Sequence, residues 1–254
     1  MNIVFIGSGN VATHLAIAFK AMGADIIQVW SKDSRNAEIL AALTKAEPIN
    51  KWEALDQTAD CYVISVKDDA IADVAGHLQD VRGIVVHTSG ATSIDVLKGA
   101  GTGYGVLYPL QTFSKTKAVD LKNVPFCIEA DRTETLEKIS AVAHLLSAAV
   151  AEVSSDQRKV LHLAAVFACN FTNHLYHLSS KLLAEHNLKF DLLKPLIEET
   201  AQKIRYAAPI EVQTGPAIRD DRETMKKHVN LLADSPHLQE IYVILSNSIK
   251  NTEL

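Results

Sequence analysis

The sequence predicts an α/β N-terminal half with a doubly wound parallel sheet, followed by an all-α C-terminal half. Strand and helix patterns alternate over residues 1–153, which is typical of a parallel sheet covered by helices. At the start of the chain an apolar run passes through a glycine-rich turn into an amphipathic stretch. From Ser154 onward the periodicity is helical only. We therefore expect two domains, residues 1–153 and residues 154–254.

Short apolar runs predict the strands of the first half, and helical periodicity predicts the helices between them. The expected strands cover residues 3–7, 26–30, 61–66, 84–87, 104–108, 126–129 and 151–153. The expected helices cover residues 12–22, 35–44, 69–78, 94–97 and 133–149. Ligands of doubly wound sheets bind at the carboxyl ends of the strands, so the loops after the strands are where we expect a site.

The second half is expected to consist of helices over residues 154–186, 191–206 and 220–232, with a last helix from residue 235. Ser154 and Gln157 have the spacing of a capping box, which predicts where the first of these helices begins. A helix of this length is unusual in a globular domain. At a domain junction it suits a dimer surface, and we expect a homodimer.

The turn after the first strand has the spacing Gly7-x-Gly9-x-x-Ala12. Gly7 permits a tight turn, Gly9 lets the backbone approach a phosphate, and Ala12 lets the helix pack closely on the strand. The first helical N–H groups and the helix dipole then favour an anion. The pattern predicts a dinucleotide-binding turn rather than an ordinary tight turn of an α/β domain. The residues assigned to the cofactor here are Gly7, Ser8, Gly9, Asn10 and Val11.

The end of the second strand indicates which dinucleotide is bound. NAD sites carry an acidic residue there for the ribose hydroxyls. This strand ends at Trp30, and Ser31, Lys32 and Arg35 follow it, a hydroxyl and two cations that suit a 2′-phosphate. We therefore predict NADP rather than NAD. Asp33 could still turn toward the ribose and favour NAD, and the whole loop could be a solvated charged segment.

Three later strand ends carry polar residues that are expected to meet near the nicotinamide. Ser65, Val66 and Lys67 follow one strand and are assigned to the cofactor, although Lys67 could simply pair with its neighbouring aspartate in solvent. His87 ends the next strand and is a candidate proton donor or acceptor, or a histidine bonded to the backbone at the start of a loop. Two residues of these loops are predicted to bind substrate: Ser89 and Gln111.

On the long helix, turned at 100° per residue, polar residues gather within an arc of about 120°. This stripe comprises Arg158, His162, Asn170, Asn173 and His177. We expect it to line a cleft, with His162 as the proton donor and Asn170 holding a carbonyl or hydroxyl. It could also be a hydrogen-bonded helix or subunit interface. His174 and His177 lie three residues apart without a carboxylate or cysteine to complete a metal site, so we predict no metal.

A Gly-Pro turn precedes a later helix and places Arg219 near its N-terminus, in the run Thr214-Gly215-Pro216-Ala217-Ile218-Arg219. Arg219 there could bind an anionic group of a substrate. It could equally form a structural salt bridge in a plain interhelical turn.

The composition excludes several classes of protein. A net charge of -5 and a pI near 6.0 argue against nucleic acid as a partner. No apolar run reaches the roughly 18 residues of a membrane span, so we expect no membrane partner. The three cysteines are isolated and form neither a disulfide framework nor a metal-ligand pattern. With no signal peptide expected before the first strand, we predict a cytoplasmic protein that acts on a small molecule.

Several segments together resemble a family of NADP oxidoreductases with a helical C-terminal domain of unknown function. These segments are residues 6–12, 29–31, 87–90, 108–113, 162–171 and 214–216. The resemblance is to enzymes like the deazaflavin-dependent NADP oxidoreductases, in a wider group with pyrroline-5-carboxylate reductases and 6-phosphogluconate dehydrogenase-like enzymes. It implies two domains, a dimer, and nicotinamide redox chemistry in an interdomain cleft.

The chain departs from its wider group in the expected catalytic residues. β-Hydroxyacid dehydrogenases of this group use a Lys-x-x-x-Asn pair, whereas Lys159 and Asn170 are not so spaced and His162 stands nearer that place. The serine or threonine pattern of pyrroline-5-carboxylate reductases is not recognisable either. We expect hydride transfer between NADP and a small carbonyl, imine or hydroxy compound. The alternative is a protein that binds NADP without turnover, as a redox sensor or partner protein.

Overall fold

The computed structural model describes residues 1–251, and its contacts divide the chain into two compact units. The first unit runs from Met1 to Cys169, and the second begins at Asn170. The break in contacts therefore falls inside a helical segment. The domain boundary at residue 153 remains a prediction.

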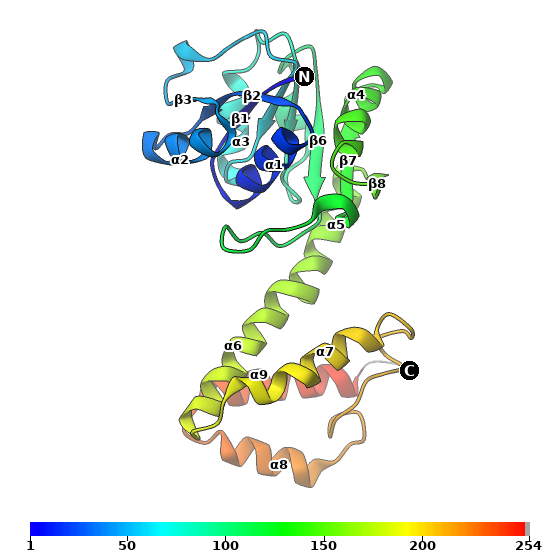
Figure 1. Cartoon of the computed structure of the whole chain (residues 1–254). Helices are drawn as coiled ribbons and strands as arrows, with labels where there is room; N and C mark the ends of the chain where they lie inside the picture. The colour runs from blue at the N-terminus through cyan, green and yellow to red at the C-terminus, as the bar shows by residue number, and fades with distance from the viewer. Residues whose placement is uncertain (252–254) are drawn as a thin grey trace. The chain divides into compact units, whose positions relative to one another are not determined.

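The first unit is built on an eight-stranded sheet, with helices packed on it (Figure 1). The strand order is β3-β2-β1-β4-β5-β6-β7-β8. Because the order reverses direction between β1 and β4, the sheet is doubly wound and has a switch point there. The strands are β1 (Asn2–Ile6), β2 (Asp25–Trp30), β3 (Glu47–Ile49), β4 (Cys61–Ile64), β5 (Ile84–His87), β6 (Gly103–Pro109), β7 (Phe126–Ala130) and β8 (Val150–Glu152).

The sheet differs from the prediction in two places. β7 pairs antiparallel with β6, whereas every other pairing is parallel, so the sheet is mostly and not wholly parallel. The chain returns from β6 to β7 through a loop, which only an antiparallel partner allows without a crossover helix. β3 was not predicted, because it is three residues long with Pro48 at its centre. As the first strand in the order, it lies at an edge, where proline is tolerated.

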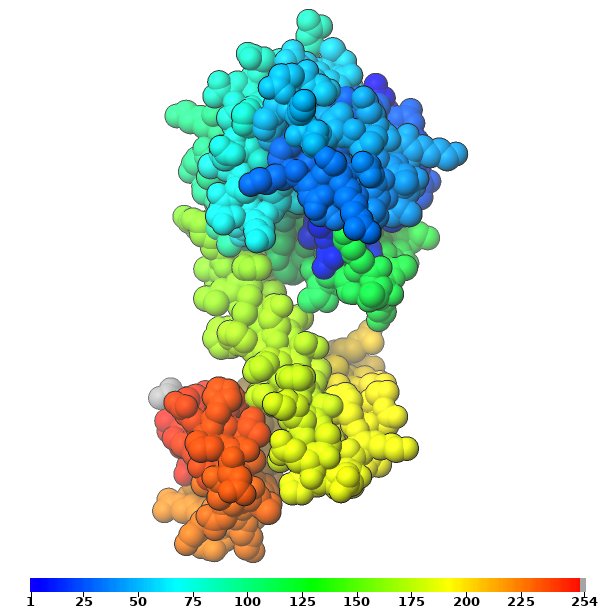
Figure 2. Space-filling view, turned by 90° about the vertical axis from the view of Figure 1, so that its left-hand side faces the viewer, coloured from blue at the N-terminus to red at the C-terminus, as the bar shows by residue number. Residues whose placement is uncertain are grey.

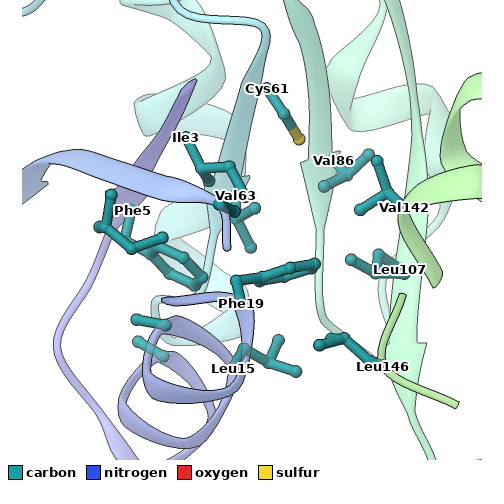
Figure 3. Close-up of a cluster of buried hydrophobic side chains, with 14 of the residues drawn as sticks. Ile3, Phe5, Leu15, Phe19, Cys61, Val63, Val86, Leu107, Val142 and Leu146 are labelled. Atoms are coloured by element: carbon teal, nitrogen blue, oxygen red, sulfur yellow. The ribbon is translucent and has the colours of Figure 1, made fainter. Parts of the chain in front are cut away.

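Side chains alternate between the two faces of the sheet and form two hydrophobic clusters. Ile3 and Phe5 of β1 join the cluster shown in Figure 3, which lies between the sheet and α1, α2 and α4. Val4 and Ile6 of the same strand join the second cluster, under α3 and the turn that follows β5. Because β1 is buried on both faces, its sequence is a continuous apolar run. Such a run is easy to recognise as a strand.

The helices of the first unit are α1 (Asn10–Ala21), α2 (Ser34–Thr44), α3 (Ile71–Gly76), α4 (Thr133–His144) and α5 (Ser155–Ala165), with 3-10 turns at Trp52–Ala54, Asp68–Ala70, Ile94–Leu97 and Leu121–Asn123. Two predicted lengths were wrong. The helix expected over residues 69–78 is a 3-10 turn followed by the short α3. The helix expected over residues 133–149 ends at His144, because the chain must reach β8 at Val150.

The helix expected over residues 154–186 begins as predicted but is not continuous. Ser154 and Gln157 form the capping box of α5. A π-helical segment, Val166–Phe171, then separates α5 from α6 (Thr172–Glu185). Its i→i+5 hydrogen bonds break the 3.6-residue period. The polar stripe drawn with that period from Arg158 to His177 is therefore not one continuous face.

The second unit is all α-helical from α6 onward, as predicted. It contains the 3-10 turn Phe190–Leu193 and the helices α7 (Lys194–Lys203), α8 (Arg222–Leu231) and α9 (Pro236–Lys250). These helices, yellow-green to red in Figure 2, carry apolar side chains at the surface. Over residues 1–251, none of the helices is both long enough and apolar enough to cross a bilayer.

Candidate functional site

A cavity of about 900 Å³ opens at the carboxyl ends of the strands of the first unit. Its volume lies in the range of small-molecule and cofactor sites. The cavity is lined by the glycine turn, by the loops after β2, β4, β5 and β6, and by one residue of α5, His162. It therefore occupies the place where doubly wound sheets bind their ligands.

The glycine turn has the geometry that a phosphate site needs. Gly7 has φ +111°, and a Cβ there would meet the Ser65 carbonyl oxygen at 2.2 Å. A Cβ on Gly9 would meet nothing within 4 Å, so the backbone faces open space. Gly9 caps α1 without a side-chain hydrogen bond, and the first turn of α1 contains no acidic residue. This turn fits a dinucleotide pyrophosphate, because the residues at the N-terminus of α1 line the cavity and the first turn of that helix carries no carboxylate.

Beyond β2, the structure places only part of the predicted 2′-phosphate set at the cavity. Ser31 and Lys32 line it, whereas Arg35 does not. Asp33, the alternative ribose ligand, also lines the cavity; it is the N-cap of α2 and accepts a hydrogen bond from the Arg35 backbone N–H at 2.9 Å. Capping of α2 is therefore one reason for an aspartate at this position. Asn36, one residue after Arg35, lines the cavity and was missed.

The loops after β4 and β5 meet, as their strand positions predict. Ser65, Val66 and Lys67 line the cavity, together with Thr88, which the sequence did not single out. The Ser65 and Thr88 hydroxyl oxygens lie 3.0 Å apart. This hydrogen bond joins the ends of β4 and β5 and holds together the part of the cavity wall that the two residues form.

His162 contacts a tyrosine for which the sequence predicted no role. The hydroxyl of Tyr108, on β6, lies 3.1 Å from Nδ1 of His162, and both residues line the cavity. The two rings meet edge to face, with centroids 6.1 Å apart. Gly90 makes room for the pair, because a Cβ there would lie 2.7 Å from that Nδ1 atom. Sequence spacing could not reveal this contact, since it joins residues 54 positions apart.

Burial keeps the Tyr108 phenol protonated. Desolvation raises the pKa of Tyr108, and the neighbouring Cys127 acts in the same direction. The hydroxyl can therefore donate its hydrogen bond to Nδ1 of His162. In that arrangement a neutral His162 carries its proton on Nε2, whereas a ring that is protonated on both nitrogens donates from Nδ1–H to the hydroxyl oxygen instead.

His87, predicted as a second proton carrier, is buried instead and does not line the cavity. Its Nδ1 accepts a hydrogen bond from the Ser89 backbone N–H at 3.1 Å. Burial and then the charge of Arg158 lower the pKa of His87 to about 3. His87 is thus a neutral histidine that holds the start of the loop, which was the alternative interpretation of this residue.

The two predicted substrate residues of the first unit both line the cavity. The Ser89 hydroxyl accepts hydrogen bonds from the backbone N–H groups of Ala91 and Thr92, at 3.1 and 3.0 Å. The Gln111 Oε1 atom accepts one from the Thr112 backbone N–H at 2.7 Å. The Ser89 hydroxyl therefore stabilises the turn that contains it. In Gln111 the side-chain oxygen is hydrogen-bonded within its own loop.

Arg158, placed in the polar stripe from sequence, does not face a cleft. Its side chain is fully buried and contacts the Glu129 carboxylate at 2.6 Å and the Thr92 carbonyl at 2.6 Å. Ser155 completes the group by donating to Glu129 at 2.7 Å. These contacts tie α5 to β7 and to the loop after β5. They hold the helix that carries His162.

The remaining predicted residues, Asn170 and Arg219, belong to the second unit, and neither lines this cavity. Arg219 is exposed just before α8, whose N-cap is Asp221. Their assignment to substrate stays a prediction. Within residues 1–251, no cluster of three or more His, Cys, Asp or Glu side chains could hold a metal ion.

A doubly wound sheet with this glycine turn at its switch point is typical of dinucleotide-binding proteins. Residues 2–90 match the family described as NADP oxidoreductase, coenzyme F420-dependent. Residues 124–249 match a domain of unknown function, DUF2520. The chain is 44% identical to a protein from Bacteroides fragilis described as an NADP oxidoreductase, with a TM-score of 0.94, and the match covers 99% of this chain and 98% of that one.

More distant structures share the fold alone. One is an imine reductase from Myxococcus stipitatus in complex with NADP+, at 16% identity and TM-score 0.65, covering 98% of this chain and 92% of that one. Another is a pyrroline-5-carboxylate reductase from Coxiella burnetii, at 17% identity and TM-score 0.60, covering 98% and 96%. A search of curated proteins finds no match.

The chain belongs to the NADP oxidoreductase family whose members join this N-terminal domain to DUF2520. This membership confirms the resemblance drawn from the sequence. It also confirms NADP as the cofactor of the family.

Proposed function

We propose that this protein is an NADP-dependent oxidoreductase that moves hydride between the nicotinamide and a small carbonyl, imine or hydroxy compound. The observation that carries the proposal is one cavity that contains both the phosphate-type turn and the Tyr108–His162 pair. Family membership supports the cofactor, and the polar pair supports proton transfer beside it.

Different residues of the cavity would bind different parts of the cofactor. Gly7, Gly9 and the start of α1 would hold the pyrophosphate, while Ser31 and Lys32 would hold the 2′-phosphate. Ser65 and Thr88 would lie along the wall toward the nicotinamide end. NADPH, when bound, supplies the hydride, and the chain supplies orientation and the proton.

His162 is the proton carrier in this proposal. As hydride adds to the carbon of a C=O or C=N bond, His162 reacts as the imidazolium: its Nε2–H gives the proton to the oxygen or nitrogen, which forms an alcohol or amine and leaves a neutral imidazole. The Nδ1–H of the ring donates to the Tyr108 hydroxyl oxygen before and after the transfer, which holds the ring in place and leaves Nε2 as the nitrogen that exchanges the proton. In the direction of oxidation the same nitrogen accepts the proton.

The test is NADPH oxidation with a panel of small ketones, aldehydes and cyclic imines, comparing His162→Gln with wild type. Loss of a general acid lowers turnover by about 10²–10⁴-fold. His144→Gln is the matched control, because His144 is an exposed histidine on α4, outside the cavity. A His162→Gln protein that turns over at the wild-type rate would remove the proton role. NADPH binding without turnover of any compound would favour the sensor alternative.

We also propose a homodimer, for a reason that lies in the second unit. From Asn170 to residue 251, only Ala217 and Leu232 are buried apolar side chains. Large apolar side chains stay exposed on its helices: Leu192, Leu196, Ile204, Leu231, Val243, Ile244 and Leu245. Exposed apolar surface of this kind is typical of an interface. A second copy of the chain, carrying the same surface, is the simplest way to cover it.

A further inference from the structure

The segment after β6 makes a set of contacts that neither the fold nor the proposed reaction explains. Residues 111–117, here called the strap, lie against the glycine turn. The Asn10 side-chain amide donates to the Phe113 carbonyl at 3.0 Å, and a ring nitrogen of His14 lies 2.9 Å from the Ser114 carbonyl. The rings of His14 and Phe113 are 5.0 Å apart. The strap therefore docks on the first turns of α1, at the proposed phosphate site.

Lys115 of the strap reaches the turn itself. Its Nζ donates to the Ser8 carbonyl oxygen at 3.0 Å. Ser8 lies between Gly7 and Gly9, and its hydroxyl donates to the Ser31 hydroxyl at 3.1 Å. Lys115 thus spans 107 positions of sequence to place an ammonium group at the centre of the turn.

The partner of Lys115 is a neutral carbonyl, and in the described part of the chain no carboxylate forms an ion pair with this lysine. Its charge is therefore not compensated locally. Lys115 contacts the turn from outside the residues that line the cavity, and the two lysines that line it are Lys32 and Lys67, after β2 and β4. The Ser8 hydroxyl and the Asn10 amide already donate to Ser31 and to the strap. The turn then offers an anion its backbone N–H groups and the helix dipole.

We propose that Lys115 is a cofactor-binding residue that pairs with the pyrophosphate of NADP(H), and that the strap tightens on α1 when the nucleotide binds. This inference rests on the proposed cofactor site. An ammonium on the phosphate turn adds a charge-assisted bond to the dipole attraction. Because NADPH and NADH share the pyrophosphate, Lys115 serves both nucleotides equally, whereas Lys32 serves only the 2′-phosphate of NADPH.

The experiment is a titration of the full chain with NADPH and with NADH at low salt. It follows the fluorescence of Trp30, which lines the cavity, and calorimetry checks the result. Lys115→Gln should raise Kd about tenfold for both nucleotides, as expected for loss of one charge-assisted hydrogen bond. Lys32→Gln should raise Kd for NADPH alone. Lys117→Gln is the matched control: it removes the same charge from the same strap, two residues away, and should leave both Kd values unchanged.

The salt dependence and the hydrogen exchange of the strap give further readouts. The Kd of wild type should rise with salt more steeply than that of Lys115→Gln, because screening weakens a charge contact. NADPH should slow amide exchange over residues 111–117 in wild type, and less so in Lys115→Gln.

Three results would overturn the proposal. Equal Kd values for Lys115→Gln and Lys117→Gln would remove the role of Lys115 and leave the cofactor site intact. A loss confined to NADPH would assign Lys115 to the 2′-phosphate. Failure of wild type to bind either nucleotide would overturn the proposed function as well.

Discussion

The two units of this chain bury their apolar residues very differently. The first unit has a large cluster on each face of its sheet, and Ile3, Phe5 and Phe19 in one of them are fully inaccessible. The described part of the second unit has two buried apolar residues, and those are 6% and 9% exposed. Because burial of apolar surface is the main favourable term in folding, the first unit contains the means of its own stability, whereas the second needs a covering surface.

The largest effect should come from charging the uncovered surface of the second unit. Leu196 on α7 is 62% exposed, so Leu196→Glu leaves the fold of one chain intact but places a charge in the proposed dimer interface. We expect the mass measured by light scattering to fall from dimer to monomer. Met22→Glu, at a similarly exposed apolar residue of the first unit, should leave the mass unchanged. A wild-type monomer would contradict the proposed dimer directly.

A substitution in the core of the first unit should come next. Phe19→Ala removes a fully buried ring from α1 and should lower the free energy of unfolding by about 3–5 kcal/mol. Urea unfolding followed by tryptophan fluorescence measures this change. Leu231→Ala at the end of α8, 75% exposed, is the comparison in the second unit. Both variants are measured at a concentration at which the chain is a monomer. Equal losses in the free energy of unfolding would contradict the difference in burial between the two units.

The buried ion pair of the first unit should matter slightly less. Glu129→Gln leaves the buried Arg158 guanidinium without its carboxylate, which should cost about 3 kcal/mol. The exposed pair of Lys194 and Asp191 in the second unit is screened by solvent, so Asp191→Asn should have no measurable effect. Urea unfolding measures the change in the free energy of unfolding for each variant. A Glu129→Gln protein as stable as wild type would show that the pair is not needed to hold α5.

The smallest effect is a change of stability with pH between pH 6.5 and 5. Because the pKa of His87 is lowered from 6.5 to about 3, the unfolded chain binds a proton on this residue between these two pH values and the native chain does not. Its contribution is fully present above pH 6.5 and is lost as pH falls toward 3, at about 1.4 kcal/mol per pH unit. His87→Asn should flatten this dependence between pH 6.5 and 5, measured by urea unfolding. His177→Asn, at an exposed histidine of α6, should leave the slope as in wild type.

Only some of the residues at the candidate site could be predicted from the sequence. The glycine turn, Ser31, Lys32 and the loop after β4 lie at the cavity as predicted, because turn chemistry and strand ends are local features. Arg35 was assigned to the same site but is absent from the lining, while Asn36 is present. Which residue of a helix faces a cavity depends on how that helix packs, and the loop sequence does not contain that information.

The sequence by itself determined the alternation of strands and helices, the dinucleotide turn and the all-α second half. Each of these is encoded within a few residues, by apolar periodicity, glycine spacing or a capping box. Only the tertiary structure decided that β7 runs antiparallel, that His87 and Arg158 are buried, and that Tyr108 meets His162. Those facts depend on contacts between distant segments, which pack by shape and burial and leave no periodic signal in the chain.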